Sequence, residues 1–466
     1  MDRYNPKTIL NKHPNKLMTG IKYRLIIMFN VVVFLGASMA AEDRFSQVQL
    51  LAQNLVKNGD IKGIQAAFIK GGEITYQFSY EHSIANATPL DNDTKLRVAS
   101  ISKLVVALTV LMAVDEKRLK LDQDVSTYLQ SSFRNPHFSD QKITLRHLLS
   151  HTSSIRDGTY YWAGPGDSIT DFFDSNGKHF NGGEHFSSTH EPGAYFQYSN
   201  LAFGVIASIL ESVYQQRFDE IVTRKLLKPM GLSARFSACN ILKETRNLGA
   251  LYRKQDADGK WRPNASWREQ VDGHHVQCFY GANKLSSDSG VAQIEQSFES
   301  LKAYLPGNNG TLFSPQGGLR ASASDIAKIL IMIDRNGRYG DRQILSKVAI
   351  AELFKVQWQF NEPLKNGNTG GETATKYESD GLMTQFGLSL HQIDGVDWGL
   401  SKASKKLFGH LGFAYGLLGQ AWLDEAGNGM VLLVTGTADD PAKAPSISPL
   451  YQVEESLLSA WLESIE

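Results

Sequence analysis

Two pairs of strand-like segments lie near opposite ends of the 466-residue chain, and this separation constrains the fold most. Each pair is joined by a glycine-containing turn typical of a β-hairpin: 64–70 with 73–80, and 417–423 with 431–435. The long stretch between the pairs has mainly helical periodicity. The sequence therefore predicts an α+β fold, in which both chain ends build one antiparallel sheet that is flanked by helices and carries an inserted, mainly helical region.

Helical periodicity predicts the segments that flank the sheet and fill the middle of the chain. Three signals help to bound them: Gly59 as a stop, Thr144 as an N-cap, and Ser322 with Asp325 as a capping box. The predicted helices cover residues 45–58, 144–151, 201–217, 322–333 and 451–465. Periodicity is weak from 233 to 314, and this stretch is interpreted as a decorated insertion.

The first 40 residues have the pattern of a leader rather than of a folded segment. Basic residues at 22 and 24 precede a short apolar run at 25–37, and small residues follow at Ser38 and Ala40. This order is typical of a signal peptide. We expect residues 1–40 to be a signal peptide or N-terminal leader, residues 41–466 to form the mature domain, and the protein to be periplasmic or secreted. An uncleaved N-terminal membrane anchor is the alternative, and Met18 is a second candidate start.

The balanced charge of the chain argues against a nucleic-acid partner, and its two cysteines leave a disulfide open. The chain has 48 Lys and Arg against 48 Asp and Glu, which gives no reason to expect a nucleic-acid partner. Its two cysteines, Cys239 and Cys278, could pair in an oxidising compartment or remain free thiols. No His-Glu-x-x-His or Cys-x-x-Cys spacing indicates a zinc site.

The apolar run VASISKLVVALTVLM, residues 98–112, contains Ser100 and, three residues later, its only cation, Lys103. On a helix these two side chains share one face. An amine that is desolvated by the apolar residues around it can activate a neighbouring hydroxyl as a nucleophile. The alternative is structural: Ser100 would be a plain N-cap, and Lys103 would pack its stem on apolar surface and keep its ammonium group in solvent.

Two further short motifs carry candidate chemistry. Tyr198-Ser199-Asn200 precedes an apolar helix, and its phenol and amide could transfer a proton and bind a substrate carbonyl. His410-Leu411-Gly412 is expected on an edge strand, where Gly412 would leave room for a substrate and His410 could donate a hydrogen bond. The alternatives are a helix cap with a core tyrosine, and a structural histidine.

Together, Ser100-x-x-Lys103, Tyr198-x-Asn200 and His410-x-Gly412, in this order, resemble the motifs of one family. This is the family of serine hydrolases related to class C β-lactamases, D,D-carboxypeptidases, D-aminopeptidases and some esterases. The phrases ITLRHLLSHTSSI, EPGAYFQYSN, LLKPMGL and GGLRASASDIAKIL are similar as well, so the resemblance covers about residues 63–434. It implies a β-lactamase-like fold and a reaction through an acyl-enzyme, without a metal or cofactor.

The resemblance also implies a role for each matching residue. Ser100 would be the acylated nucleophile, Lys103 its proton partner, and Tyr198 the general base. Asn200 would orient the substrate, and His410 occupies the position where β-lactamases usually carry lysine. The backbone N–H groups of Ser100 and Phe413 would form the oxyanion hole. His151, in the phrase LLSHTSSI, is interpreted as structural.

The chain departs from the family pattern at Leu411, where threonine or serine is common. Leucine has no hydrogen-bond donor for the carboxylate of a penicillin or a D-alanyl peptide. The sequence therefore predicts an exported serine hydrolase that acts on a small ester, a D-amino-acid peptide or a related amide, with β-lactamase activity less favoured. The alternative is a catalytically weak penicillin-binding or ligand-binding relative. Its partner would be a small-molecule or peptide substrate, and its oligomeric state stays open.

Overall fold

The computed structural model describes residues 45–82, 89–129, 131–164, 166–256, 258–273, 301, 304–371, 381–438 and 447–466. Within this part of the chain, the principal sheet has eight strands in the order β2-β1-β14-β13-β12-β11-β10-β9, and each neighbouring pair is antiparallel. The strands are β1 (Gly63–Lys70), β2 (Glu73–Glu81), β9 (Trp358–Gln359), β10 (Gln385–Phe386), β11 (His391–Asp394), β12 (Lys406–Ala414), β13 (Leu417–Asp424) and β14 (Gly429–Val434).

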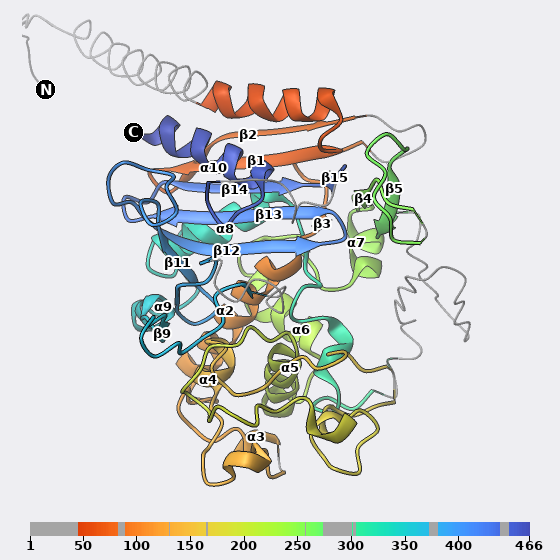
Figure 1. The fold of residues 1–466 in the computed structure, drawn as a ribbon, viewed down its shortest axis with the longest axis vertical. Helices are drawn as coiled ribbons and strands as arrows, with labels where there is room; N and C mark the ends of the chain where they lie inside the picture. The colour runs from red at the N-terminus through yellow and green to blue at the C-terminus, as the bar shows by residue number, and fades with distance from the viewer. Residues whose placement is uncertain are drawn as a thin grey trace, which may run out of the picture.

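The two ends of the chain meet in this sheet, as the sequence predicts. The N-terminal hairpin β1–β2 pairs with the C-terminal hairpin β13–β14 through β1 and β14, with Ile64 opposite Val434. The strands lie across one end of the molecule, and the helical region occupies the other end (Figure 1). The predicted α+β architecture is therefore confirmed.

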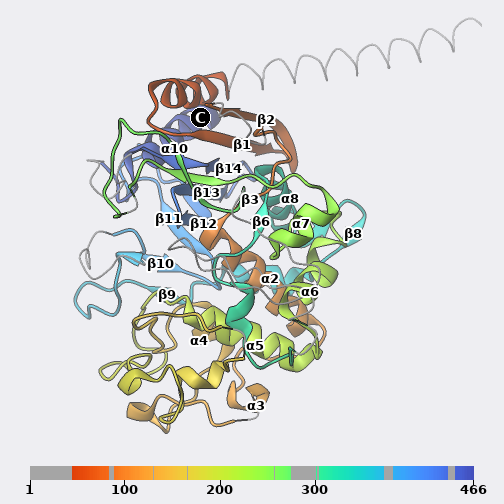
Figure 2. The ribbon, with the colours of Figure 1, turned by 90° about the vertical axis from the view of Figure 1, so that its right-hand side faces the viewer.

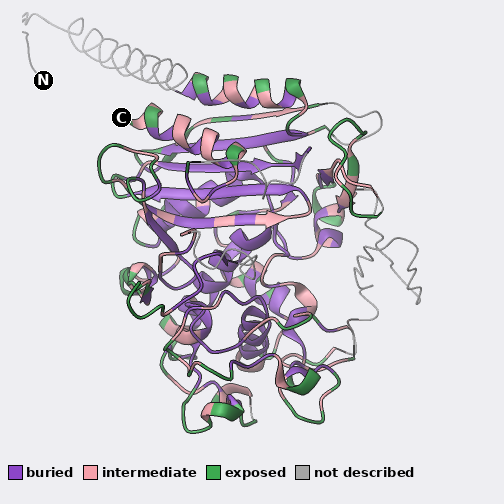
Figure 3. Cartoon of the chain, viewed as in Figure 1, coloured by how far each residue is buried: buried purple, intermediate pink, exposed green. Residues whose placement is uncertain are grey.

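Both faces of the sheet are covered, so β1 is apolar on both sides. Phe68 packs with the helix at residues 45–58 and with α10 (Gln452–Ile465), whereas Ala67 and Ile69 pack in the cluster that contains α8 (Ala323–Asp334). Phe45 and Phe68 stack with ring centroids 4.5 Å apart. Burial of each ring contributes about 1.5–3 kcal/mol. Figure 2 shows the sheet between these two helical layers, and Figure 3 shows that its strands are largely buried.

Two 14-residue helices, α2 (Ser102–Asp115) and α5 (Leu201–Tyr214), form the centre of the helical region. Most residues of both helices are buried, as expected for helices that are apolar all round. The other helices are α3 (Ser126–Leu129), α4 (Leu145–Leu149), α6 (Phe218–Val222), α7 (Ala238–Glu244) and α9 (Lys347–Phe354). The remaining short strands are β3 (Leu96–Arg97), β4 (Leu251–Arg253), β5 (Arg268–Val271), β6 (Arg320–Ala321), β7 (Arg338–Tyr339), β8 (Arg342–Gln343) and β15 (Gly436–Thr437).

Local signals placed several boundaries correctly. Thr144 caps α4 by accepting from the His147 N–H, and Ser322 with Asp325 forms the predicted capping box of α8. The prediction of one helix over 201–217 is wrong at its end. Gln215 has a left-handed backbone (φ +52°), which stops α5 at Tyr214.

Three sequence predictions fall wholly or partly outside the described residues. The leader at 1–40 lies outside them, and so does Cys278, so pairing with the buried Cys239 stays a prediction. The described part of the segment 233–314 holds α7, β4 and β5. Among the helices that the structure describes, none is long and apolar enough to cross a membrane.

Candidate active site

Ser100 lies in a short 3-10 turn, Ala99–Ile101, that leads directly into α2. Ile101 is the N-cap of α2, so the interpretation of Ser100 as a plain cap of this helix is wrong. The preceding residue, Ala99, has a positive φ of 47°, a strained conformation for a residue with a side chain. Such strain recurs at functional sites, and here it precedes a serine that is only 8% exposed.

Lys103 is completely buried, so it does not extend its charge into water. Its Nζ atom lies 3.0 Å from Ser100 Oγ, 2.7 Å from Asn200 Oδ1 and 2.9 Å from the Gln316 carbonyl oxygen. These three acceptors match the three N–H donors of an ammonium group. If the amine were neutral, its lone pair could instead accept the proton of the Ser100 hydroxyl.

Tyr198 lies beside this amine and is held by His151. Lys103 Nζ is 4.8 Å from the centroid of the Tyr198 ring, and the His151 ring stacks on Tyr198 at 4.2 Å with an interplanar angle of 23°. His151 follows α4 in a left-handed conformation (φ +57°), and its Nδ1 accepts from the Ser199 N–H at 3.1 Å. Burial, together with nearby Lys103 and His410, holds the pKa of His151 well below its usual range. It is therefore a neutral support for Tyr198.

Asp157 fixes the orientation of the Asn200 amide. One carboxylate oxygen accepts from the backbone N–H groups of Asn200 and Leu201, at 2.6 and 2.9 Å, and thereby satisfies donors at the start of α5. The other oxygen accepts from Asn200 Nδ2 at 2.9 Å. Because Nδ2 is engaged in this way, the amide oxygen Oδ1 faces Lys103.

The strand β12 brings His410 and Gly412 close to the segment that carries Ser100. β12 pairs with β13 along its length and with β11 from Lys406 to Gly409. The prediction of an edge strand is therefore wrong for the whole strand, but β11 does not pair with β12 beyond Gly409, where His410 and Gly412 lie. A Cβ atom on Gly412 would lie 2.6 Å from the Val98 carbonyl oxygen. The space at Gly412 is thus filled by the segment that carries Ser100, and glycine permits this close approach.

His410 is buried and neutral. Its Nδ1 lies 2.6 Å from the Leu411 carbonyl oxygen, and its Nε2 makes no hydrogen bond to any residue that the structure describes. Burial, with contributions from Lys103 and the neighbouring His391, lowers the pKa of His410 to about 3. Because Nδ1–H donates to a carbonyl, Nε2 carries the lone pair and is a hydrogen-bond acceptor. His410 therefore does not replace the positive charge of a lysine.

The side chains of Leu411 and Phe413 lie on the other face of β12. Both pack against the apolar cluster that includes α10, and the Phe413 ring lies 5.3 Å from that of Tyr451. Only the backbone of Phe413 is therefore available for the predicted oxyanion hole. Among the residues that the structure describes, no group of three or more His, Cys, Asp or Glu side chains is placed to hold a metal ion.

The structure thus brings Ser100, Lys103, Tyr198 and Asn200 together, and the centroid of the His410 ring lies 6.4 Å from that of Tyr198. The sequence did not predict two further contributors, the carboxylate of Asp157 and the backbone carbonyl of Gln316. His151 was expected to be structural, and its position as a neutral support of Tyr198 agrees with that interpretation. The phrase that contains it was the signal in the sequence.

Comparison with known proteins agrees with this geometry. The family model described as Beta-lactamase matches residues 48–448, and the chain therefore belongs to the beta-lactamase family of the serine hydrolase superfamily. Protein flp of Staphylococcus aureus is 25% identical over 196 residues, which make up 41% of this chain and 38% of that protein. The match thus spans well under half of the relative's length.

Solved structures show the same fold. The D-amino acid amidase from Ochrobactrum anthropi SV3 complexed with L-phenylalanine is 17% identical, with a TM-score of 0.59, and the match covers 91% of this chain and 98% of that chain. EstCE1, described as a hydrolase with promiscuous acyltransferase activity, is 19% identical, with a TM-score of 0.58, and the match covers 90% of this chain and 99% of that chain. At these identities the likeness establishes the β-lactamase-like fold alone.

Proposed function

We propose that this protein is an exported serine hydrolase that cleaves a small ester, a D-amino-acid peptide or a related amide through an acyl-enzyme. The observation that carries the proposal is the contact of 3.0 Å between Ser100 Oγ and the completely buried amine of Lys103. A hydroxyl beside a buried amine is the arrangement in which the amine can accept its proton. The hydrolases among the proteins of the same fold support the reaction class.

The reaction would begin with attack of Ser100 Oγ on the substrate carbonyl carbon, while its proton passes to the Lys103–Tyr198 pair. The backbone N–H groups of Ser100 and Phe413 would bind the oxyanion. Tyr198 would then protonate the leaving group, and water would hydrolyse the acyl-enzyme by the reverse proton route. Asn200, fixed by Asp157, would orient the substrate and Lys103.

The third motif favours substrates without a carboxylate next to the scissile bond. His410 is neutral because its pKa is about 3, and the side chain of Leu411 packs against the cluster that includes α10. Neither group offers the cation or hydroxyl that would bind a penicillin carboxylate. The second candidate function, a weak penicillin-binding relative, rests on the intact Ser100 and Lys103 alone.

The test is to incubate the purified protein with p-nitrophenyl acetate and butyrate, D-phenylalanine amide and a fluorescent penicillin, with Ser100→Ala as the control. Turnover of an ester or amide that depends on Ser100, without lasting penicillin label, supports the proposal. Stable penicillin label at Ser100 without turnover of any substrate would favour the second candidate. Turnover that survives in Ser100→Ala would refute the nucleophile.

Export is a separate part of the proposal and rests on the pattern at residues 22–40. Expression of the full chain in a bacterium, followed by N-terminal sequencing of the periplasmic and secreted fractions, should find a mature chain that starts after about Ala40. A full-length chain that stays in the membrane fraction would show that the leader is an anchor instead.

A further inference from the structure

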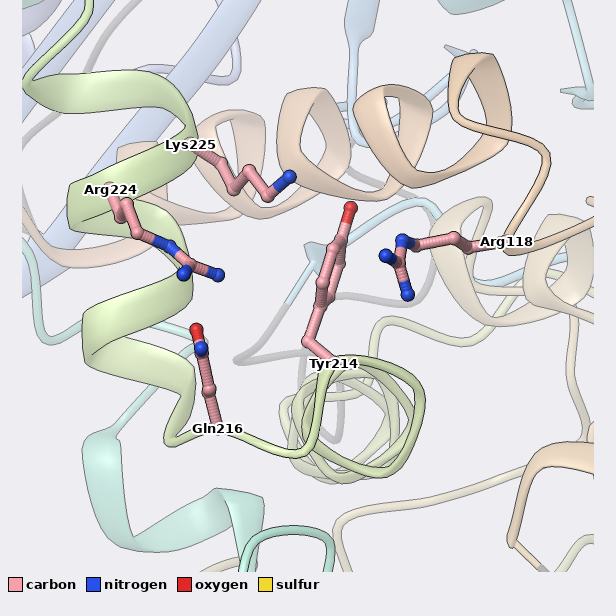
Figure 4. Close-up of a pocket in the computed structure, with 5 residues that line it drawn as sticks. All are labelled: Arg118, Tyr214, Gln216, Arg224 and Lys225. Atoms are coloured by element: carbon pink, nitrogen blue, oxygen red, sulfur yellow. The ribbon is translucent and has the colours of Figure 1, made fainter.

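A basic pocket lies at the opposite end of α2 and α5 from Ser100. Its volume is about 530 Å³, and it is lined by Arg118, Tyr214, Gln216, Arg224 and Lys225 (Figure 4). Arg118 follows the end of α2, and Tyr214 is the last residue of α5. Because each helix has 14 residues, the pocket is separated from the active site by roughly 20 Å. A ligand of the pocket would not touch a substrate at Ser100.

One side of the pocket is held rigidly by Glu116. This carboxylate accepts from the Tyr214 hydroxyl at 2.9 Å, from Lys225 Nζ at 2.7 Å and from Arg118 Nε at 3.2 Å. Arg118 and Lys225 also lie 5.0 Å from the centroid of the Tyr214 ring. The tyrosine therefore has a fixed position between two cations, and Glu116 neutralises one of the three positive charges around it.

Arg224 is the pocket cation that Glu116 does not contact. Its side chain is exposed and makes no hydrogen bond or ion pair with any residue in the described part of the chain. It lies in a π-helical turn, Thr223–Leu227, in which the Lys228 N–H donates to the Thr223 carbonyl at 2.9 Å. Successive residues of an α-helix do not share a face, yet Arg224 and Lys225 both line the pocket. π-Turns of this kind are rare and often occur at functional sites.

The remaining charges nearby do not cancel this surplus. The carboxyl ends of α2 and α5 each carry about half a negative charge, which offsets roughly one cation. The acidic residues of α6, Asp219 and Glu220, are paired with Arg217 at 3.0 and 3.2 Å. Arg217 offsets only one of these two carboxylates, and the exposed Lys228, which lines the adjoining surface with Arg224, offsets the other. After Glu116, the helix ends and these groups are counted, about one positive charge is left for a ligand.

We propose that this pocket binds the phosphate monoester group of a small ligand. The Arg224 guanidinium and the Lys225 ammonium lie on one side of the Tyr214 ring, and Arg118 lies on the other side (Figure 4). A guanidinium fork can bind two phosphate oxygens, and the ammonium beside it can bind a third. The Gln216 amide supplies a neutral donor, and a volume of about 530 Å³ has room for an organic substituent. The same chemistry is offered by a soluble phosphate ester and by the headgroup of an anionic phospholipid.

The test is a calorimetric titration of the full mature protein with glycerol 3-phosphate and inorganic phosphate, and with vesicles of phosphatidylglycerol against vesicles of phosphatidylcholine. Saturable binding of the soluble phosphates identifies a soluble ligand, and binding of the anionic vesicles alone identifies a lipid headgroup. In either case, Arg224→Gln should weaken binding by roughly 10- to 100-fold and leave ester hydrolysis unchanged.

Arg338→Gln is the matched control, because Arg338 is also exposed and its side chain makes no hydrogen bond or ion pair within the described residues. It should change binding by less than about twofold, since an unspecific surface charge contributes little at physiological salt. The proposal is overturned if no probe binds, or if Arg338→Gln weakens binding as much as Arg224→Gln does.

Discussion

The two ends of α2 and α5 each carry a lysine beside a tyrosine, and the two pairs differ in what surrounds them. Lys103 Nζ lies 4.8 Å from the Tyr198 ring, and Lys225 Nζ lies 5.0 Å from the Tyr214 ring. Lys103 is completely buried and faces a hydroxyl, an amide oxygen and a carbonyl oxygen. Lys225 is 25% exposed and faces the carboxylate of Glu116.

The comparison shows that partners and burial, rather than the residue pair, determine the chemistry. Burial and the hydrogen bond to Glu116 raise the pKa of Tyr214, so its phenol keeps its proton. Tyr214 can therefore hold a structure together but cannot act as a base. Tyr198 lies next to a buried amine that contacts a serine hydroxyl, which is the setting in which a phenol can exchange a proton.

The largest difference between the two ends should appear when each lysine is replaced. Lys103→Met keeps the volume of the side chain but removes the proton partner of Ser100, so turnover should fall by at least roughly 10³-fold. Lys225→Met should leave turnover within about twofold. Steady-state ester hydrolysis, with circular dichroism to verify folding, measures both. Normal turnover by folded Lys103→Met would remove this residue from the mechanism.

Replacing Tyr198 should mainly affect activity, whereas replacing Tyr214 should mainly affect stability. Tyr198→Phe should lower turnover by roughly 10²-fold or more and leave the fold intact, as expected for loss of a general base. Tyr214→Phe should retain turnover but lower the free energy of unfolding by about 1–3 kcal/mol, because it loses a hydrogen bond to a carboxylate. Kinetics and urea unfolding of both variants are the measurements. The comparison fails if both variants lose the same property.

Asp157→Asn should disturb the active-site end through the orientation of Asn200. An amide nitrogen at position 157 would face Asn200 Nδ2, so Asn200 would turn a donor toward Lys103 in place of its oxygen. We expect kcat/KM to fall by about 10- to 100-fold, the effect of a misplaced polar contact. Asp167→Asn, in the same loop region but bonded to Lys178 and His179, is the control and should keep its activity. Equal kinetics for the two variants would exclude the positioning role.

The smallest effect concerns pH and the buried imidazole of His410. Its pKa is lowered from 6.5 to about 3, so the unfolded chain binds more protons at this residue as the pH falls below 6.5. Its contribution to stability is present above pH 6.5 and is lost as the pH falls toward 3. Between pH 7 and 5.5 the loss is about 1 kcal/mol. Urea unfolding of His410→Gln should show a pH dependence weaker by this amount, and an unchanged dependence would contradict the assignment of a buried neutral imidazole.

Sequence reasoning worked where the decisive interactions are local. The hairpins of β1–β2 and β13–β14, the Thr144 cap and the Ser322–Asp325 box all depend on residues a few positions apart. The end of α5 could not be read in this way, because nothing in the composition around Gln215 requires its left-handed backbone.

The site was predictable as three motifs but not as a network. Lys103 was expected near Ser100 from their spacing, whereas its contact with the Gln316 carbonyl joins residues more than 200 positions apart and involves no side chain of residue 316. Asp157 meets Asn200 in the same non-local manner. The expectation that Gly412 leaves room for a substrate could not anticipate the Val98 carbonyl, because that contact depends on how β12 packs on the segment that carries Ser100.

The most direct test of the account is intact-mass and peptide mass spectrometry of the protein, quenched with acid during turnover of p-nitrophenyl butyrate. The account predicts one butyryl group per chain on the peptide that contains Ser100, and none in Ser100→Ala. Acylation of a different residue, or continued hydrolysis by Ser100→Ala, would contradict the central claim that the buried amine of Lys103 activates Ser100.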